Sequence, residues 1–359
     1  MLKHTVMIVD DAEINLLMLH EIMSSEYNVV SANSGKEAIQ LMENQLPDIV
    51  LLDLNMPDMN GFDVLQRMKE TPKLSGVLVI FVTAETETYM EEKGLDMGAV
   101  DYVHKPYNER IIKYKVRNHL ELKDYRDSLE DLVQVRTQQL LTSHEAIITS
   151  MSLMAEKRDK VTGDHLARIK LSTHILAHKF SQMYPEILSP SDADQIALYS
   201  PLHDLGKVAI PDAILGKPGK LTQEEYETMK SHTTEGGGIL RETNTILIGS
   251  DKELQFAIDI AEGHHERFDG TGYPRGLSGE SIPIAARIVS LVDVYDALRS
   301  ARPYKEAYTH EESHQIITVG DGRTMPEHFD PHVLKIYEMM QAELDRVCVE
   351  FKDKEPVSH

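Results

Sequence analysis

The stretch from Tyr107 to Thr162 contains neither glycine nor proline, so no residue in it interrupts a helix. Apolar residues recur within it at steps of three and four, which is the spacing of one face of a helix. We predict a single long helix here. A chain of 359 residues has room for two ordinary domains, and we predict a first domain at 1–121, a helical linker at 122–150 and a second domain at 151–359.

The apolar seam of this predicted helix is clearest between Leu122 and Leu132. It weakens at Arg136 and Gln139, so the pattern falls short of the sustained heptads of a long coiled coil. We predict a parallel homodimer joined along the seam. A helix packed against its own domains is the alternative. If the helix couples the two domains, a signal in one of them must favour one register or tilt of the helix over another.

The N-terminal part alternates short apolar runs with amphipathic patterns. The runs predicted as strands are Thr5–Val9, Asn28–Ser31, Ile49–Asp53 and Val77–Val82, and patterns such as Glu13–Ser24 and Gly35–Asn44 are typical of helices. This alternation predicts an α/β domain with a doubly wound, flavodoxin-like parallel sheet. In such sheets the functional residues lie at the carboxyl ends of the strands.

Side chains suited to bind a cation or a phosphoryl group follow these strands: Asp10, Asp11, Asp53, Thr83 and Lys105. Three carboxylates brought together repel one another unless a hard cation lies among them, and oxygen ligands suit Mg²⁺. Asp53 can then accept a phosphoryl group, with Thr83 placed to hydrogen-bond it and Lys105 to pair with its charge. We also expect a cis peptide bond before Pro106.

This segment resembles the receiver domains of response regulators in the runs Val9–Asp11, Asp53–Gly61, Val82–Ala84 and Lys105–Pro106. The resemblance implies control by a cognate sensor histidine kinase, with Asp53 as the phosphoacceptor. It also implies a magnesium site and a set of switch residues. The magnesium site would comprise Asp10, Asp11, Asp53 and Asn55, and the switch residues would be Thr83, Tyr102 and Lys105. A receiver that serves only for docking or dimerisation is the alternative.

Beyond residue 151 nearly the whole sequence has helical spacing interrupted by prolines and glycines, which predicts an all-α bundle. Histidines and aspartates of the kind that bind metals are scattered through it. The pair His264-His265 stands just before the glycine-rich turn Gly270–Pro274. Because bundles build metal sites from side chains on facing helices, ligands far apart in the sequence can meet.

His203 and Asp204 are about 100° apart on a predicted helix, and Lys207 lies on the same face. Together with Gly272–Pro274 they resemble the HD-GYP family, bacterial metal-dependent phosphodiesterases that hydrolyse cyclic di-GMP. Further matches are Arg158-Asp159, Lys217–Gly219, Ile282-Pro283 and Arg302–Lys305. The resemblance implies an HD-type helical bundle that hydrolyses cyclic di-GMP to linear pGpG, or onward to GMP.

The resemblance also implies the residues of a two-metal site. One ion would be held by His165, His203, Asp204 and Asp293. The other would be held by His232, His264 and His265, with Asp204 as a bridge. Asp204 and Lys207 would act in catalysis. Substrate contacts would come from Asp159, Tyr273, Asp296, Arg302 and Lys305.

Two ions of this kind can share a hydroxide, lower its pKa and orient it toward a phosphodiester. A nitrogen-rich, carboxylate-bridged ligand set suits divalent Fe or Mn better than Mg²⁺. One subset of the family carries a glutamate four residues before the first histidine, where it serves a third metal. Val161 occupies that position here, so we predict two metals.

The composition narrows the class of protein. A formal net charge of −22 and a pI near 5.2 argue against DNA binding, because phosphate backbones are bound by clustered Lys and Arg. The single cysteine, Cys348, fits a reducing compartment. With no apolar run long enough for a signal peptide or membrane span, we expect a cytoplasmic protein.

Two alternatives for the function stay open. One is an effector that binds the nucleotide and signals through a protein partner, and the other an enzyme for a different cyclic dinucleotide.

Overall fold

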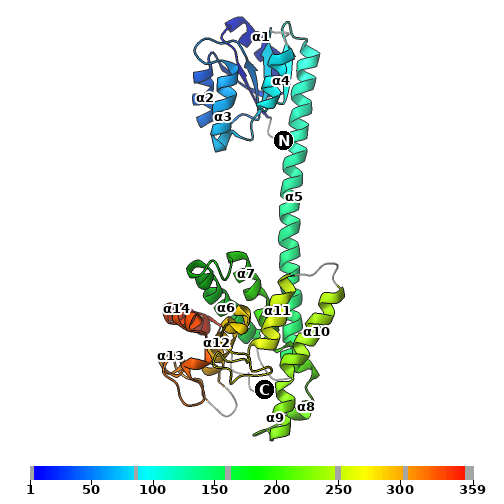
Figure 1. The fold of residues 1–359 in the computed structure, drawn as a ribbon. Coiled ribbons are helices and arrows are strands. Elements are labelled where there is room, and N and C mark those ends of the chain that lie inside the picture. Colours follow the sequence, from blue (N-terminus) through cyan, green and yellow to red (C-terminus); the bar gives the residue numbers. More distant parts are fainter. Residues whose placement is uncertain (1–3, 85–87, 158–162, 247–251, 302–305, 352–359) are drawn as a thin grey trace. The chain divides into compact units, whose positions relative to one another are not determined.

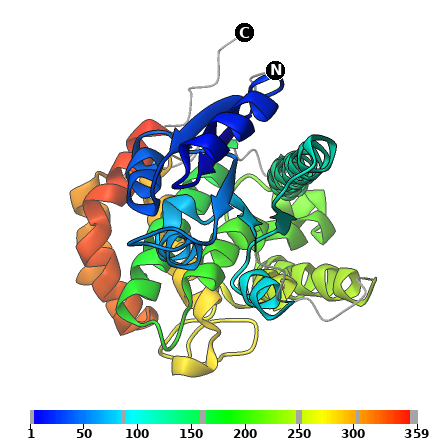
Figure 2. The ribbon, with the colours of Figure 1, turned by 90° about the horizontal axis from the view of Figure 1, so that it is seen from above.

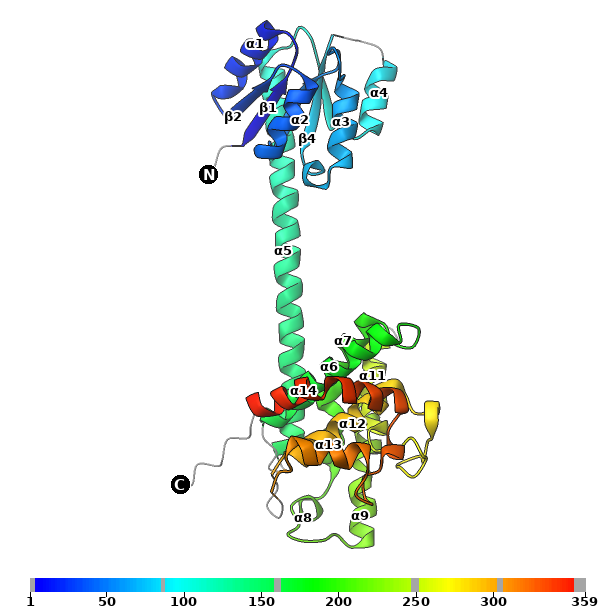
Figure 3. The ribbon, with the colours of Figure 1, turned by 90° about the vertical axis from the view of Figure 1, so that its left-hand side faces the viewer.

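The computed structural model describes residues 4–84, 88–157, 163–246, 252–301 and 306–351 (Figure 1). Its contacts divide the chain into two units, Met1–Gln138 and Gln139–His359. The division falls inside the predicted linker. Figures 2 and 3 show the same ribbon from two further directions.

The first unit contains a five-stranded parallel sheet with the strand order β2-β1-β3-β4-β5, which confirms the predicted doubly wound domain. The strands are β1 (Thr5–Val9), β2 (Asn28–Ala32), β3 (Ile49–Asp53), β4 (Leu78–Thr83) and β5 (Asp101–His104). Two of the four predicted strands have the predicted bounds, β2 ends one residue later than predicted, and β4 begins and ends one residue later. The sequence analysis missed β5, because it has only four residues and two of them are polar.

Helices cover both faces of the sheet. They are α1 (Glu13–Ser24), α2 (Gly35–Asn44), α3 (Gly61–Glu70), α4 (Thr88–Asp96) and the 3₁₀ turn η1 (Pro72–Leu74). Because alternate strand residues point to opposite faces, Met7 and Phe81 pack with α2 and α3, whereas Ile8 and Ile80 pack with α1 and the start of α5 (Glu109–Glu156). β3, buried along its whole length, lies between these two cores.

α5 is one helix of 48 residues, which confirms the prediction of a single long helix (Figure 3). The apolar seam predicted on it lies open in the single chain. Leu122 is 57% exposed and Leu132 51% exposed. No helix among the described residues is long and apolar enough to cross a membrane.

Every regular element among the described residues of the second unit is a helix, which confirms the predicted all-α bundle. Its longer helices are α6 (Gly163–Met183), α7 (Pro190–Tyr199), α9 (Gln223–Lys230), α10 (His232–Ile246), α11 (Lys252–Gly263), α12 (Ile284–Arg299), α13 (His310–Thr318) and α14 (Pro331–Glu350). Shorter pieces are η3 (Ser200–Ala209), α8 (Asp212–Leu215), η4 (Gly279–Ser281) and η5 (Pro326–His328). Their apolar faces enclose one core, in which Phe180, Tyr295 and Tyr337 are the largest fully buried side chains.

A glycine allows η3 to lie directly against α10. A Cβ atom on Gly206 would stand 1.9 Å from the carbonyl oxygen of His232 and 2.4 Å from the backbone nitrogen of Gly236. Both atoms belong to backbone and cannot rotate away. Only glycine permits this approach, which brings His203 and Asp204 of η3 toward His232.

Candidate metal centre

η3 carries the His-Asp pair and the lysine predicted for catalysis. It is a 3₁₀ helix with three residues per turn, rather than the expected α-helix, so Asp204 and Lys207 lie one above the other. The Lys207 Nζ atom lies 2.8 Å from Asp204 Oδ2. Although burial opposes ionisation, Lys207 and His203 hold the pKa of Asp204 well below its ordinary value. Asp204 is therefore a carboxylate at neutral pH.

Three buried imidazoles are oriented by backbone carbonyls that precede them in the chain. The Nδ1–H groups of His203, His232 and His264 donate to carbonyl oxygens three or four residues earlier, at 3.0, 2.8 and 3.0 Å. Because a carbonyl can only accept, each Nδ1 carries a proton, which leaves Nε2 as the nitrogen that can bind a metal. This is the tautomer in which Nε2 can bind a metal.

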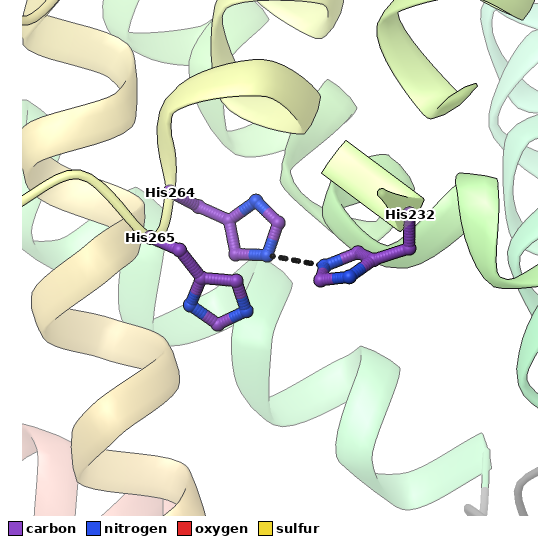
Figure 4. A group of neighbouring side chains, drawn as sticks. All are labelled: His232, His264 and His265. Atoms are coloured by element: carbon purple, nitrogen blue, oxygen red, sulfur yellow. Dashed lines mark hydrogen bonds between the residues drawn. The ribbon is translucent and has the colours of Figure 1, made fainter. Parts of the chain in front are cut away.

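The Nε2 atoms of His232 and His264 face one another at 3.4 Å (Figure 4). With Nδ1 protonated in both rings, neither neutral Nε2 atom has a hydrogen to donate along the dashed line, whereas a cation beside them would satisfy both. The ring of His265 lies close by, with its centroid 4.1 Å from that of His264. Burial lowers the pKa of His264 far below its ordinary value and that of His265 to about 4, and neighbouring histidines add to both effects. These imidazoles are therefore neutral at pH 7.

Asp204 stands between two groups of ligand-type atoms. Its Oδ2 atom lies 3.3 Å from His203 Nε2, while its Oδ1 atom lies 3.3 Å from His232 Nε2 and 3.9 Å from His264 Nε2. Asp293, on α12, joins the first group with its Oδ1 atom 3.9 Å from His203 Nε2. The structure thus brings together the residues of both predicted groups, with one carboxylate common to the two.

His165, on α6, completes the first group, its ring centroid 5.7 Å from that of His203. Its Nδ1 atom lies 2.6 Å from a carboxylate oxygen of Asp296, which also accepts hydrogen bonds from Arg168. Burial opposes ionisation of Asp296, but His165 and Arg168 lower its pKa to about 2. A buried carboxylate in this position fixes the ring of a ligating histidine. Asp296 thus faces His165, although we had predicted a substrate contact for it.

The turn Gly270–Pro274 folds back beside His265. Tyr273 donates its backbone N–H to the His265 carbonyl at 3.2 Å, and the two rings lie 4.8 Å apart. A Cβ atom on Gly272 would stand 2.3 Å from the backbone nitrogen of Arg267, so the turn requires glycine there. Burial raises the pKa of the Tyr273 phenol, which stays neutral.

Glu266, which no motif singled out, holds the segment that follows this turn. Its buried carboxylate accepts the backbone N–H groups of Arg275 at 2.7 Å and Leu277 at 3.0 Å. The sequence offers a weak signal for this role, since Glu266 directly follows the histidine pair. Its partners lie nine and eleven residues away and could not be predicted from spacing.

Three of the predicted substrate contacts, Asp159, Arg302 and Lys305, lie outside the described residues, as does Val161.

Another glutamate was missed by the sequence analysis. Glu156, the last residue of α5, is 1% exposed, and its Oε1 atom lies 3.4 Å from His165 Nε2.

The donor set fits divalent metals. Among the described residues the His203 Nε2 atom is buried without a hydrogen-bond partner. His232, His264 and His265 each offer a nitrogen within 4.8 Å of the other two, and so do Glu156, His165 and His203 with one ligand atom each. Imidazoles and buried carboxylates in this arrangement are typical transition-metal ligands.

The predicted phosphoacceptor site is also assembled in the first unit. Asp10, Asp11 and Asp53 offer carboxylate oxygens within 4.8 Å of one another. Lys105 Nζ lies 2.7 Å from Asp10 and 3.1 Å from Asp53, after a peptide bond to Pro106 that is cis, as predicted. Burial raises the pKa of Asp53, Lys105 opposes this rise, and the nearby Asp10 and Asp11 add to it. A divalent cation would relieve this repulsion.

The expected switch residues Thr83 and Tyr102 lie on the neighbouring strands β4 and β5. Thr83, at the end of β4, is buried. Tyr102, on β5, packs against Phe81 and donates its hydroxyl to the Met90 carbonyl at 2.8 Å. Asn55 follows β3 and is exposed.

Comparisons with known proteins agree with this arrangement. The model of the response regulator receiver domain matches residues 6–117, and that of the HD domain matches residues 128–333. A probable cyclic di-GMP phosphodiesterase of Vibrio cholerae is 38% identical over 98% of this chain and 81% of its own length. The cyclic di-GMP phosphodiesterase response regulator RpfG of Xanthomonas campestris is 32% identical, over 96% of this chain and 90% of its own.

A relative named for another substrate matches the second unit. A 3'3'-cGAMP-specific phosphodiesterase of Vibrio cholerae is 40% identical over 195 residues, which are 54% of this chain and 34% of that protein. A phosphoacceptor domain followed by a metal-binding helical bundle defines a response regulator with an enzymatic output domain. The chain belongs to the response regulators whose output is an HD-type, metal-dependent phosphodiesterase domain, as its motifs predicted.

Proposed function

We propose that this response regulator hydrolyses cyclic di-GMP to linear pGpG, or onward to GMP, at a two-ion site formed around Asp204. The observation that carries the proposal is the position of this carboxylate. Its two oxygens face different groups of imidazole nitrogens, each at 3.3 Å from the nearest one. A carboxylate placed in this way can bridge two ions, which is the arrangement that two-metal hydrolases of phosphodiesters use.

The first group would comprise His165, His203, Asp204 and Asp293, and the second His232, His264, His265 and Asp204. Bound there, two divalent ions would supply positive charge to the phosphodiester and lower the pKa of the attacking water, and this ligand set favours Fe or Mn. Lys207, whose ammonium group lies beside Asp204, is placed to neutralise charge on the phosphate oxygens.

The nucleotide would be bound by Tyr273, which can stack on guanine, and by Arg302 and Lys305, which can pair with phosphates. Asp159 would accept hydrogen bonds from the guanine edge. Asp296 is buried against His165 and Arg168, so we propose that it acts through His165 as a positioning residue.

Phosphorylation of Asp53 by a histidine kinase would control the reaction, with Mg²⁺ bound by Asp10, Asp11, Asp53 and Asn55. The cluster of carboxylates with Lys105 beside it supports phosphoryl acceptance. A parallel homodimer along the seam of α5 would bring two such chains together.

The test is hydrolysis of cyclic di-GMP by protein loaded anaerobically with Fe or Mn. Wild type is compared with Asp204→Ala, each with and without acetyl phosphate, and Asp53→Asn serves as the control for phosphorylation. We expect turnover in wild type, at least about a thousandfold less in Asp204→Ala, and an effect of acetyl phosphate that disappears in Asp53→Asn. Binding of the nucleotide by wild type without turnover would instead support an effector. Faster hydrolysis of 3'3'-cGAMP than of cyclic di-GMP would instead make 3'3'-cGAMP the preferred substrate.

A further inference from the structure

Glu156 is a buried carboxylate without a hydrogen-bond partner. It is the last residue of α5 and is 1% exposed. Neither of its carboxylate oxygens makes a hydrogen bond within the part of the chain that the structure describes. Burying a charge without a partner is costly, so buried carboxylates are normally paired or bound to a cation.

The side chain points at the first group of ligands. Its Oε1 atom lies 3.4 Å from His165 Nε2, which is longer than a strong charge-assisted hydrogen bond. Two ligand atoms each about 2.1 Å from one ion are about 3.0 to 3.4 Å apart for angles between square and tetrahedral. One ligand atom each of Glu156, His165 and His203 lies within 4.8 Å of the other two. The distance between Glu156 Oε1 and His165 Nε2 therefore lies in the range expected for two ligands of a common cation.

We propose that Glu156 is a further ligand of the ion held by His165 and His203. The inference rests on the two-ion site proposed above and makes its two halves chemically unequal. The first ion would be bound by two imidazoles and three carboxylates, those of Glu156, Asp204 and Asp293. The second would be bound by three imidazoles and the shared Asp204. The more anionic first half favours harder ions such as Mn²⁺ over Zn²⁺.

The test measures metal binding by the full chain. Metal-free protein is titrated with Mn²⁺ against a competing chelator, and the bound metal is counted by elemental analysis after desalting. Glu156→Gln keeps the shape of the side chain and removes its charge. Glu145→Gln is the matched control, because Glu145 lies on the same helix but is half exposed in an ion pair with Lys170. The comparison is repeated in a His264→Ala background, which weakens the second half and isolates the first ion.

We expect Glu156→Gln to bind the first ion at least about tenfold more weakly, as befits the loss of one charged ligand, whereas Glu145→Gln binds it as wild type does. Melting supplies a second readout. Without metal, Glu156→Gln should melt close to the temperature of wild type, because it loses only the ion pair with His165 at 3.4 Å. Its stabilisation by Mn²⁺ should be smaller. Glu156→Asp, which retains a carboxylate, should bind with intermediate affinity and replaces the glutamine variant if that one does not fold.

Equal Mn²⁺ affinity in wild type and Glu156→Gln would overturn the inference while leaving the two-ion site intact. A loss of melting temperature that is the same with and without Mn²⁺ would make Glu156 a structural partner of His165 and would also overturn it. Wild-type protein that binds fewer than two ions would instead refute the proposed function, and this inference with it.

Discussion

At the scale of single residues, the metal centre depends on groups that fix the ligands as much as on the ligands themselves. Three buried histidines are held by backbone carbonyls three or four residues earlier in the chain, and His165 is held by Asp296. Each of these partners sets which nitrogen carries the proton. The consequence is a set of Nε2 lone pairs that converge before any ion is bound.

Glu266 has the corresponding role for the turn that carries Tyr273. Glu266→Gln would leave one of the two loop N–H groups facing an amide donor, at a cost of about 1.5 to 3 kcal/mol for a lost charged hydrogen bond. We expect KM for cyclic di-GMP to rise about tenfold or more, with kcat and metal content little changed. Steady-state kinetics with elemental analysis measure this. The exposed Glu280→Gln is the control, and an equal fall in kcat would argue for a role beyond the turn.

At the scale of elements, the site requires that η3 lie directly against α10. Asp204 lies on η3 and His232 on α10, so the two side chains meet only where these elements pack together. The contact depends on Gly206, whose missing side chain leaves room for the backbone of α10.

Gly206→Ala should separate these two elements. Its Cβ atom would collide with backbone atoms at 1.9 and 2.4 Å, and overpacking of this kind costs about 1 to 3 kcal/mol or more. We expect a lower melting temperature and fewer than two bound ions per chain. Gly238→Ala on α10 is the matched control, because its Cβ atom would meet nothing within 4 Å and alanine favours a helix. Full metal content in Gly206→Ala would show that the backbone can yield.

At the scale of the whole molecule, the seam of α5 predicts dimerisation. Leu129 is 42% exposed and Leu132 51% exposed in the single chain. Burying these side chains against a second copy of the helix would stabilise a dimer. Light scattering should give about twice the chain mass of 40.6 kDa for wild type. Glu substitutions at both positions should give the monomer mass, whereas Glu130→Gln, on an exposed polar position, should not. A monomeric wild type at micromolar concentration would refute the dimer.

The sequence by itself determined the elements and the residue types of both sites. The period of apolar residues is local, so α1, α2 and most strands were predicted to within a residue, and the absence of glycine and proline predicted α5. The ligands were identified through motifs, since His203-Asp204 and the turn around Tyr273 are short and ordered along the chain. β5 was missed because its four residues, two of them polar, are too few to show the alternation of a strand.

Only the tertiary structure decided which atoms meet. The sequence placed Asp204 among the ligands, but the position of each of its oxygens depends on how η3 packs against α10. Glu156 belongs to no motif, and it lies beside His165 because α5 ends against the bundle core. Asp296 was predicted to contact the substrate, and its pairing with Arg168 and His165 arises from the packing of α6 on α12. Such contacts join residues far apart in the chain, and the physical reason they escape sequence analysis is that packing, unlike periodicity, is not local.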